Sequence, residues 1–113
     1  MHELSIVQNL VTLCEQNAAK QNAKEVLKIE IKVGRLSGVE AHYLKSAFEV
    51  YKIGTICENA ELLINVQNIV IECEECKFSG ELSENDFTCP KCGKQNLNVI
   101  DGEDMYLMRL EMR

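Results

Sequence analysis

The sequence lacks several features that common classes of enzyme require. It contains only two histidines, at positions 2 and 42, so no Ser/His/Asp or Cys/His nucleophile set can be assembled from it. Its one short glycine loop, GRLSG at residues 34–38, has neither the P-loop spacing nor the dinucleotide-binding spacing. We therefore expect a protein that is not an enzyme.

Long apolar runs and clustered positive charge are also missing. No stretch is long enough to cross a bilayer, and Glu3 stands where a secretory signal would need basic residues. The formal net charge is −6, whereas phosphate binding requires clustered Lys and Arg. These absences predict a cytoplasmic protein that binds neither membranes nor nucleic acid.

What the chain does contain is a regular pattern of apolar residues over much of its 113-residue length. Helical spacing predicts one helix over residues 4–19 and a second over about residues 40–53. Alternation predicts strands over residues 26–34, 61–72 and 104–112. The positions expected to face the core are Leu4, Ile6, Val7, Leu10, Val11, Leu13, Cys14 and Ala18; Leu27, Ile29, Ile31 and Val33; Leu44, Ala47, Phe48 and Tyr51; Leu62, Ile64 and Val66; and Tyr106, Met108, Leu110 and Met112.

This order of elements predicts an α+β fold, with two helices packed on one face of a three-stranded sheet. Residues 70–102 differ in character, because they are poor in aliphatic side chains and hold four of the six cysteines. We expect them to form an inserted four-cysteine, zinc-ribbon-like domain. The main domain would then consist of residues 1–69 and 103–113.

The insert carries two Cys-x-x-Cys pairs, Cys73/Cys76 and Cys89/Cys92, separated by twelve residues. Two such pairs place four thiolates around one tetrahedral ion, and in a reducing compartment cysteines are kept for metals or catalysis. The pattern predicts a closed, structural zinc site. A single iron in the same cage is chemically allowed, although the insert offers only two aromatic residues to cover an electron-transfer centre.

The other cysteines and the charges of the insert suggest no further metal site. Cys14 lies on the apolar face of the first helix and Cys57 has no cysteine near it in sequence, so both are interpreted as packing residues. Six acidic residues against three lysines between residues 70 and 100 argue against nucleic acid and for a protein partner, or for no partner at all. An acidic zinc-ribbon interaction module is therefore an alternative function.

The first three residues, Met1-His2-Glu3, form a candidate chelate. The α-amine of Met1 with the backbone nitrogen and Nδ1 of His2 would close two fused rings in one plane. The backbone nitrogen of Glu3, another side chain or water would complete the square, and square-planar nitrogen ligation suits Ni(II) and Cu(II). Met1 is expected to remain, because His2 is too large for removal of the initiator methionine.

Together, MHELS, KIEIKVGRLSGVE, the paired cysteines and the closing DMYLMRLEM resemble the HypA/HybF family of nickel metallochaperones over essentially the whole chain. The resemblance implies nickel at Met1 and His2, with Glu3 supplying its backbone nitrogen or shaping the site. It implies zinc at the four cysteines of the insert.

The resemblance also implies partners. They are a HypB-type GTPase and the large subunit of [NiFe]-hydrogenase, with urease accessory proteins for some members, and the chain would be a monomer or a homodimer. Some members carry a histidine beside the cysteine pairs, where this chain has Lys77 and Gly93. A switch that depends on such a histidine is not expected here.

Overall fold

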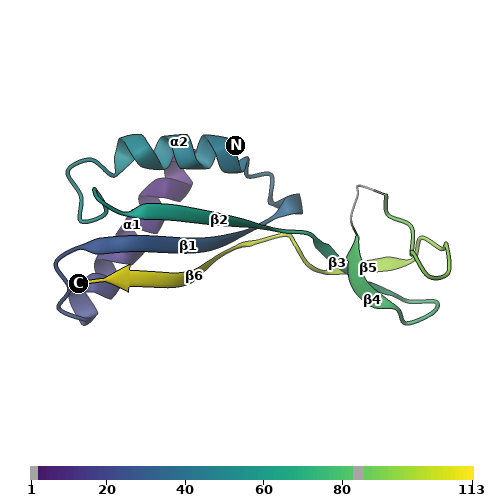
Figure 1. Cartoon of the computed structure of the whole chain (residues 1–113). Coiled ribbons are helices and arrows are strands. Elements are labelled where there is room, and N and C mark those ends of the chain that lie inside the picture. The colour runs from purple at the N-terminus through teal and green to yellow at the C-terminus, as the bar shows by residue number, and fades with distance from the viewer. Residues whose placement is uncertain (1–2, 83–85) are drawn as a thin grey trace.

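The computed structural model describes residues 3–82 and 86–113, which form two helices and two three-stranded sheets (Figure 1). No helix within these ranges is long and apolar enough to span a membrane. The elements in chain order are α1 (Glu3–Lys20), β1 (Val26–Gly34), the 3-10 turn η1 (Arg35–Ser37), α2 (Ala41–Tyr51), β2 (Glu61–Gln67), β3 (Ile69–Cys73), β4 (Ser79–Leu82), β5 (Leu97–Asp101) and β6 (Met105–Met112).

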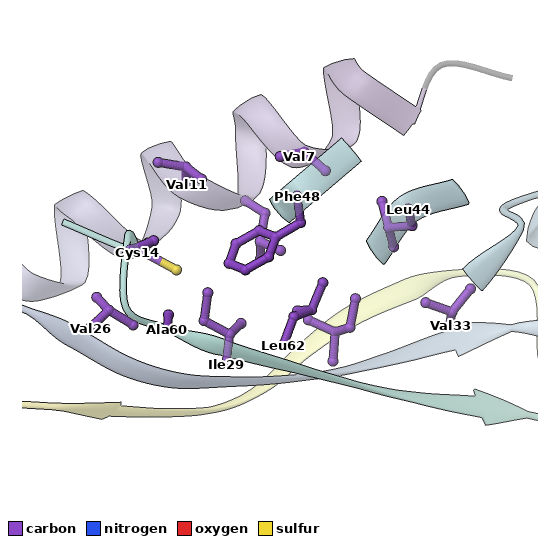
Figure 2. Packing of buried hydrophobic residues seen from close by; sticks show 13 residues of the cluster. Val7, Val11, Cys14, Val26, Ile29, Val33, Leu44, Phe48, Ala60 and Leu62 are labelled. Atoms are coloured by element: carbon purple, nitrogen blue, oxygen red, sulfur yellow. The ribbon is translucent and has the colours of Figure 1, made fainter. Parts of the chain in front are cut away.

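The first sheet has the order β2-β1-β6, and both helices cover the same face of it (Figures 1 and 2). β1 is parallel to β2 and antiparallel to β6. One apolar cluster contains the fully buried side chains of Val7 on α1, Phe48 on α2 and Ile29 on β1. The predicted α+β architecture, with two helices on a three-stranded sheet, is therefore confirmed.

The helix boundaries follow from local chemistry. α1 begins at Glu3, whose negative charge suits a helix N-terminus. Glu40 caps α2, because its side chain accepts a hydrogen bond from the His42 N–H at 3.3 Å. The predicted core face of α1 is too wide, since the side chains of Leu4 and Leu13 are 54% and 40% exposed. Both lie outside the narrower stripe formed by the buried residues Val7, Leu10, Val11, Cys14 and Ala18.

A β-bulge changes which residues of β6 face the core. Leu110 pairs with Ile29, but Leu107 pairs with Ile31, so one extra residue stands between them on β6. Since one extra residue inverts the alternation, Met105 and Leu107 pack on the core. The prediction that Tyr106 and Met108 face the core is wrong, because both are exposed, whereas Leu110 and Met112 pack as predicted.

Two other inward positions also differ from the predicted pattern. A second irregularity, between Val26 and Lys28, leaves Leu27 only half-buried and places Val26 in the core instead. Val66 stays in register with Val33 but is 53% exposed, since it lies near the end of an edge strand.

The segment predicted as one strand over residues 61–72 is two strands in different sheets. β2 ends at Gln67, and β3 begins at Ile69 and pairs antiparallel with β4 and β5 in the order β4-β3-β5. This second sheet has a small core of its own in Ile69, Ile71 and Leu82. The division of the chain into two folding units at residues 69–70 and 102–103 stays a prediction.

The two sheets meet where the chain returns from β5 to β6 (Figure 1). Gly34 donates to the Asp104 carbonyl and Leu36 to the Gly102 carbonyl, both at 2.8 Å. Lys32 reaches across to Asp101 at 3.2 Å. The end of β1 is thus tied to the residues that leave the second sheet.

Candidate metal centre

The four cysteines of the two Cys-x-x-Cys pairs converge at one end of the second sheet. Their sulfurs all lie within 4.8 Å of one another. Two of the Sγ–Sγ distances, Cys73 to Cys92 and Cys76 to Cys89, are 3.6 Å. Four sulfurs bound tetrahedrally to zinc at about 2.3 Å would be about 3.8 Å apart, so the cluster has the size of such a site.

Both pairs adopt the same backbone turn. In the first turn, Cys73 donates to the Phe78 carbonyl and accepts from the Lys77 N–H; in the second, Cys89 donates to the Lys94 carbonyl and accepts from the Gly93 N–H. Each turn has a left-handed residue just after its second cysteine, Lys77 at φ 64° and Gly93 at φ 77°. Glycine adopts this conformation without steric cost, whereas lysine is an uncommon residue for it.

Two asparagines near the start of β5 hold the first turn in place, and sequence reasoning missed them. Asn96 donates to the Glu75 carboxylate at 2.8 Å and Asn98 to the Glu74 carboxylate at 3.0 Å. The Asn96 carbonyl also accepts from the Glu74 N–H at 2.9 Å. The intervening residues Glu74 and Glu75 therefore help to join β5 to the turn. The sequence offers no signal for these contacts, because the partners are 21 and 24 residues apart.

The local environment shifts the thiol pKa values in opposite directions. Burial alone would raise the pKa of Cys89, but hydrogen bonds from the Cys92 and Lys91 backbone, with the neighbouring thiols, lower it to about 7. A hydrogen bond from the Lys94 backbone favours the Cys92 thiolate, yet burial and the three other sulfurs outweigh it and raise the pKa of Cys92 to about 12. Four adjacent sulfurs cannot all carry negative charge without a cation among them.

All four sulfurs are unbridged and point at one centre, so the arrangement is suited to a soft or borderline metal ion in tetrahedral geometry. Cys73 and Cys89 are buried, Cys76 is half-buried and Cys92 is exposed. A metal ion held by all four sulfurs would have no open position for a substrate.

The remaining candidate residues lie on the two helices, in the turn that follows α2, or outside the described ranges. Cys14 and Cys57 are both fully buried in the main core, as expected of packing residues. Their thiols interact, and the contact with Cys57 together with burial raises the pKa of Cys14. His42 is exposed on α2, and Glu3 is half-buried at the start of α1. Met1 and His2 lie outside the described residues.

Known proteins resemble this chain over its full length. Residues 1–112 match the HypA family, described as "Hydrogenase/urease nickel incorporation, metallochaperone, hypA". The hydrogenase maturation factor HypA of Aquifex aeolicus is 46% identical over 112 residues, covering 99% of this chain and 97% of that protein. HypA of Campylobacter jejuni is 46% identical over 114 residues and covers all of both chains.

Solved structures of related proteins also resemble this chain in fold. The solution structure of the nickel metallochaperone HypA from Helicobacter pylori superimposes with a TM-score of 0.71 at 32% identity, covering 99% of this chain and 97% of that one. A second solution structure of a HypA protein gives a TM-score of 0.74 at 31% identity, covering 100% and 97%. The chain therefore belongs to the HypA family of metallochaperones, which act in nickel incorporation during hydrogenase maturation.

Proposed function

We propose that this chain binds Ni(II) at its N-terminus and delivers it to the large subunit of [NiFe]-hydrogenase, while Cys73, Cys76, Cys89 and Cys92 hold a structural zinc ion. Nickel is the cargo in this scheme. Its proposed ligands are the Met1 amine and the backbone nitrogen and Nδ1 of His2, with Glu3 completing or shaping the site.

The observation that carries the proposal is the closed geometry of the cysteine cluster in a chain that matches a nickel-handling family from end to end. All four sulfurs lie within 4.8 Å of one another, so an ion at their centre uses every thiol. An ion held in this way exchanges slowly, whereas a delivery protein must release its cargo. The cargo site must then lie elsewhere in the chain.

The N-terminus offers ligands that could bind Ni(II) and also release it to another protein. An amine, a peptide nitrogen and an imidazole give Ni(II) a planar chelate with few protein ligands, and an acceptor ligand can enter from the open side. α1 begins at Glu3, which anchors the proposed chelate to a helix packed on the sheet. The other histidine, His42, lies exposed on α2.

A protein that delivers nickel needs partner proteins that receive it. We propose that the chain works in the cytoplasm with a HypB-type GTPase, and that urease accessory proteins are a second destination for nickel. The net charge of −6 favours basic protein surfaces as docking sites and disfavours nucleic acid.

Nickel titration of His2→Ala tests the proposal, with His42→Ala as the matched control. We expect His2→Ala to lose the square-planar d⁸ absorption and to bind Ni(II) at least about tenfold more weakly, because the chelate loses its imidazole ring. His42→Ala should titrate like the unmodified protein, and zinc content by elemental analysis should be equal in all three proteins.

An uncleaved extension before Met1 provides a second test that changes no side chain. It converts the primary amine into an amide, which is a far poorer ligand, while α1 and the cysteine cluster keep their sequence. Nickel affinity should fall with zinc content unchanged. Equal nickel binding by the extended protein, with the same spectrum, would move the site away from the N-terminus.

A further inference from the structure

The main core contains two thiols that take no part in the four-sulfur cluster. Cys14 lies on the buried face of α1, and Cys57 lies in the turn of residues 52–60 that joins α2 to β2. Both thiols are unbridged, and both residues are 0% exposed. They belong to the same apolar cluster, although the whole of β1 and α2 separates them in the sequence. The fold therefore brings two distant cysteines into one part of the core.

Backbone hydrogen bonds fix the position of Cys57. Its carbonyl accepts from the Ala60 N–H at 2.9 Å, and the preceding carbonyl, of Ile56, accepts from the Val26 N–H of β1 at 3.0 Å. Figure 2 shows the Cys14 side chain pointing from α1 toward the sheet, on the side where Val26 and Ala60 lie. The turn thus holds Cys57 in the part of the core that the Cys14 side chain enters.

The two thiols interact directly and are not equivalent. Each is the side-chain hydrogen-bond partner of the other. The hydrogen bond from Cys14 lowers the pKa of Cys57, although burial and the charge of Glu15 oppose this shift. The same contact, together with burial, raises the pKa of Cys14. Because the thiolate is the nucleophilic form of cysteine, Cys57 is the reactive member of the pair and Cys14 is its proton-bearing neighbour.

Burial determines which oxidant can reach this pair. Neither residue exposes any surface, so a protein or a bulky disulfide has no access to the sulfurs of the closed fold. Hydrogen peroxide is small and uncharged, and it can enter when the structure opens locally. Residues 52–60 form no helix or strand, and such connections open at lower free energy than the elements that they join.

We propose that Cys14 and Cys57 form a reversible dithiol–disulfide pair whose oxidant is hydrogen peroxide. The disulfide would tie α1 to the turn that follows α2 and would close a chain loop that contains β1 and α2. It uses no sulfur of the four-cysteine cluster, and the inference does not depend on nickel binding.

The oxidation proceeds in two steps. The Cys57 sulfur gives an electron pair to one peroxide oxygen, the O–O bond breaks, and the departing hydroxide takes the proton lost by Cys57. This step leaves water and a sulfenic acid on Cys57. The Cys14 sulfur then attacks the Cys57 sulfur, the S–O bond breaks, and the departing hydroxide takes the Cys14 proton. Two thiols are thus oxidised to one disulfide while one peroxide is reduced to two waters, and a dithiol reductant reverses the change by exchange.

Peptide mapping of the unmodified, zinc-loaded protein tests the pair. The folded protein is treated with equimolar hydrogen peroxide, remaining thiols are alkylated in denaturant, and the chain is cleaved after glutamate. Cleavage gives fragments 4–15 and 50–58, each with a single cysteine. We expect mass spectrometry to find these two fragments joined, and dithiothreitol added before alkylation to separate them. Full alkylation of both cysteines, or Cys14 joined to a cysteine of the cluster, would overturn the proposal.

Two matched serine variants test the order of the steps. Cys14→Ser keeps a hydrogen-bond donor beside Cys57 but cannot form the disulfide, so the Cys57 sulfenic acid should persist and be captured by dimedone. Cys57→Ser should give no dimedone adduct at Cys14. Circular dichroism checks the fold of both variants. Capture at Cys14, or its absence at Cys57, contradicts the assignment of Cys57 as the reacting thiol.

Denaturant unfolding measures the consequence for stability. A disulfide restricts the unfolded chain, so the oxidised protein should unfold at a higher denaturant concentration than the reduced protein. Peroxide-treated Cys14→Ser is the control for oxidation at methionine, and its midpoint should not rise. An oxidised protein that unfolds at a lower concentration would show that α1 and the turn are not placed to accept the bond.

Discussion

At the scale of single residues, Tyr106 shows how a bulge gives a side chain a different environment. It was expected in the core but lies on the open face, where the Lys32 ammonium is 5.1 Å from its ring centroid and its hydroxyl donates to Asp104 at 3.3 Å. The Asp104 charge, followed by burial and the Asp101 charge, raises the pKa of Tyr106 above its ordinary value near 10. Tyr106 thus reports on the region where the two sheets meet.

We expect Tyr106 to ionise at higher pH than a free tyrosine, and Asp104→Asn to lower its pKa toward 10. Because the folded-state pKa of Tyr106 is raised, its contribution to the free energy of unfolding is fully present below about pH 10. This contribution is lost as pH rises through the folded-state pKa. Phenolate absorbance of the Tyr43→Phe/Tyr51→Phe protein isolates this group. An unchanged titration curve in the Asp104→Asn background would show that the carboxylate is not the cause.

At the scale of elements, the contact between β1 and the chain returning from β5 holds the two sheets together. Gly34 ends β1 directly against the Gly102 carbonyl, and a Cβ atom added at Gly34 would overlap that backbone. Gly102 has φ 102° and is itself buried against Asn68 and Ile69. The two chain segments approach this closely because both positions are glycine.

Gly34→Ala should therefore destabilise the protein by about 1–3 kcal/mol, because the backbone must move apart to admit the methyl group. Denaturant unfolding measures the loss, and amide chemical shifts should change at Gly102 and Glu103. Gly54→Ala is the control for the chemical shifts. Nothing lies within 4 Å of its added Cβ, so it should leave the signals of Gly102 and Glu103 in place, although its φ of 82° strains an alanine and lowers stability in its own way. If Gly34→Ala leaves the shifts at Gly102 in place, this contact is looser than the geometry indicates.

At the scale of the whole molecule, the two sheets differ in what stabilises them. Among the described residues, thirteen buried side chains form the core between the two helices and the first sheet, whereas the cluster of the second sheet contains three, Ile69, Ile71 and Leu82. Three buried aliphatic side chains are too few to offset the ordering of about thirty residues. The proposed zinc would add to the stability of this sheet, since the apparent binding free energy of zinc in small zinc domains is about 10–16 kcal/mol.

Removal of the metal should consequently unfold one sheet and spare the other. With Cys89→Ala, or after chelation, we expect amide signals of β3, β4 and β5 to collapse to unfolded positions while those of β1 and β2 persist. Cys14→Ala is the control: it opens a cavity in the main core but should keep one equivalent of metal. A cooperative loss of both sheets in Cys89→Ala would argue against two folding units.

Much of this protein was determined by the sequence alone, because the relevant physics is local. Helical spacing placed Val7, Val11 and Phe48 in the core, and two short Cys-x-x-Cys pairs brought four sulfurs together. The paired cysteines are informative because the backbone hydrogen bonds within each turn join residues at most five positions apart. Motifs spread along the sequence also identify the family.

Only the tertiary structure decided the features that depend on pairing between distant segments. The bulge in β6 moved Tyr106 and Met108 outward because β1, more than seventy residues earlier in the chain, sets its register. The break at Asn68 sends one apolar run into two sheets, and no periodicity reveals which strand each half will join. Alternation predicts that residues share a face, but the partner strand and the covering helix decide whether that face is buried, as Val66 and Leu13 illustrate.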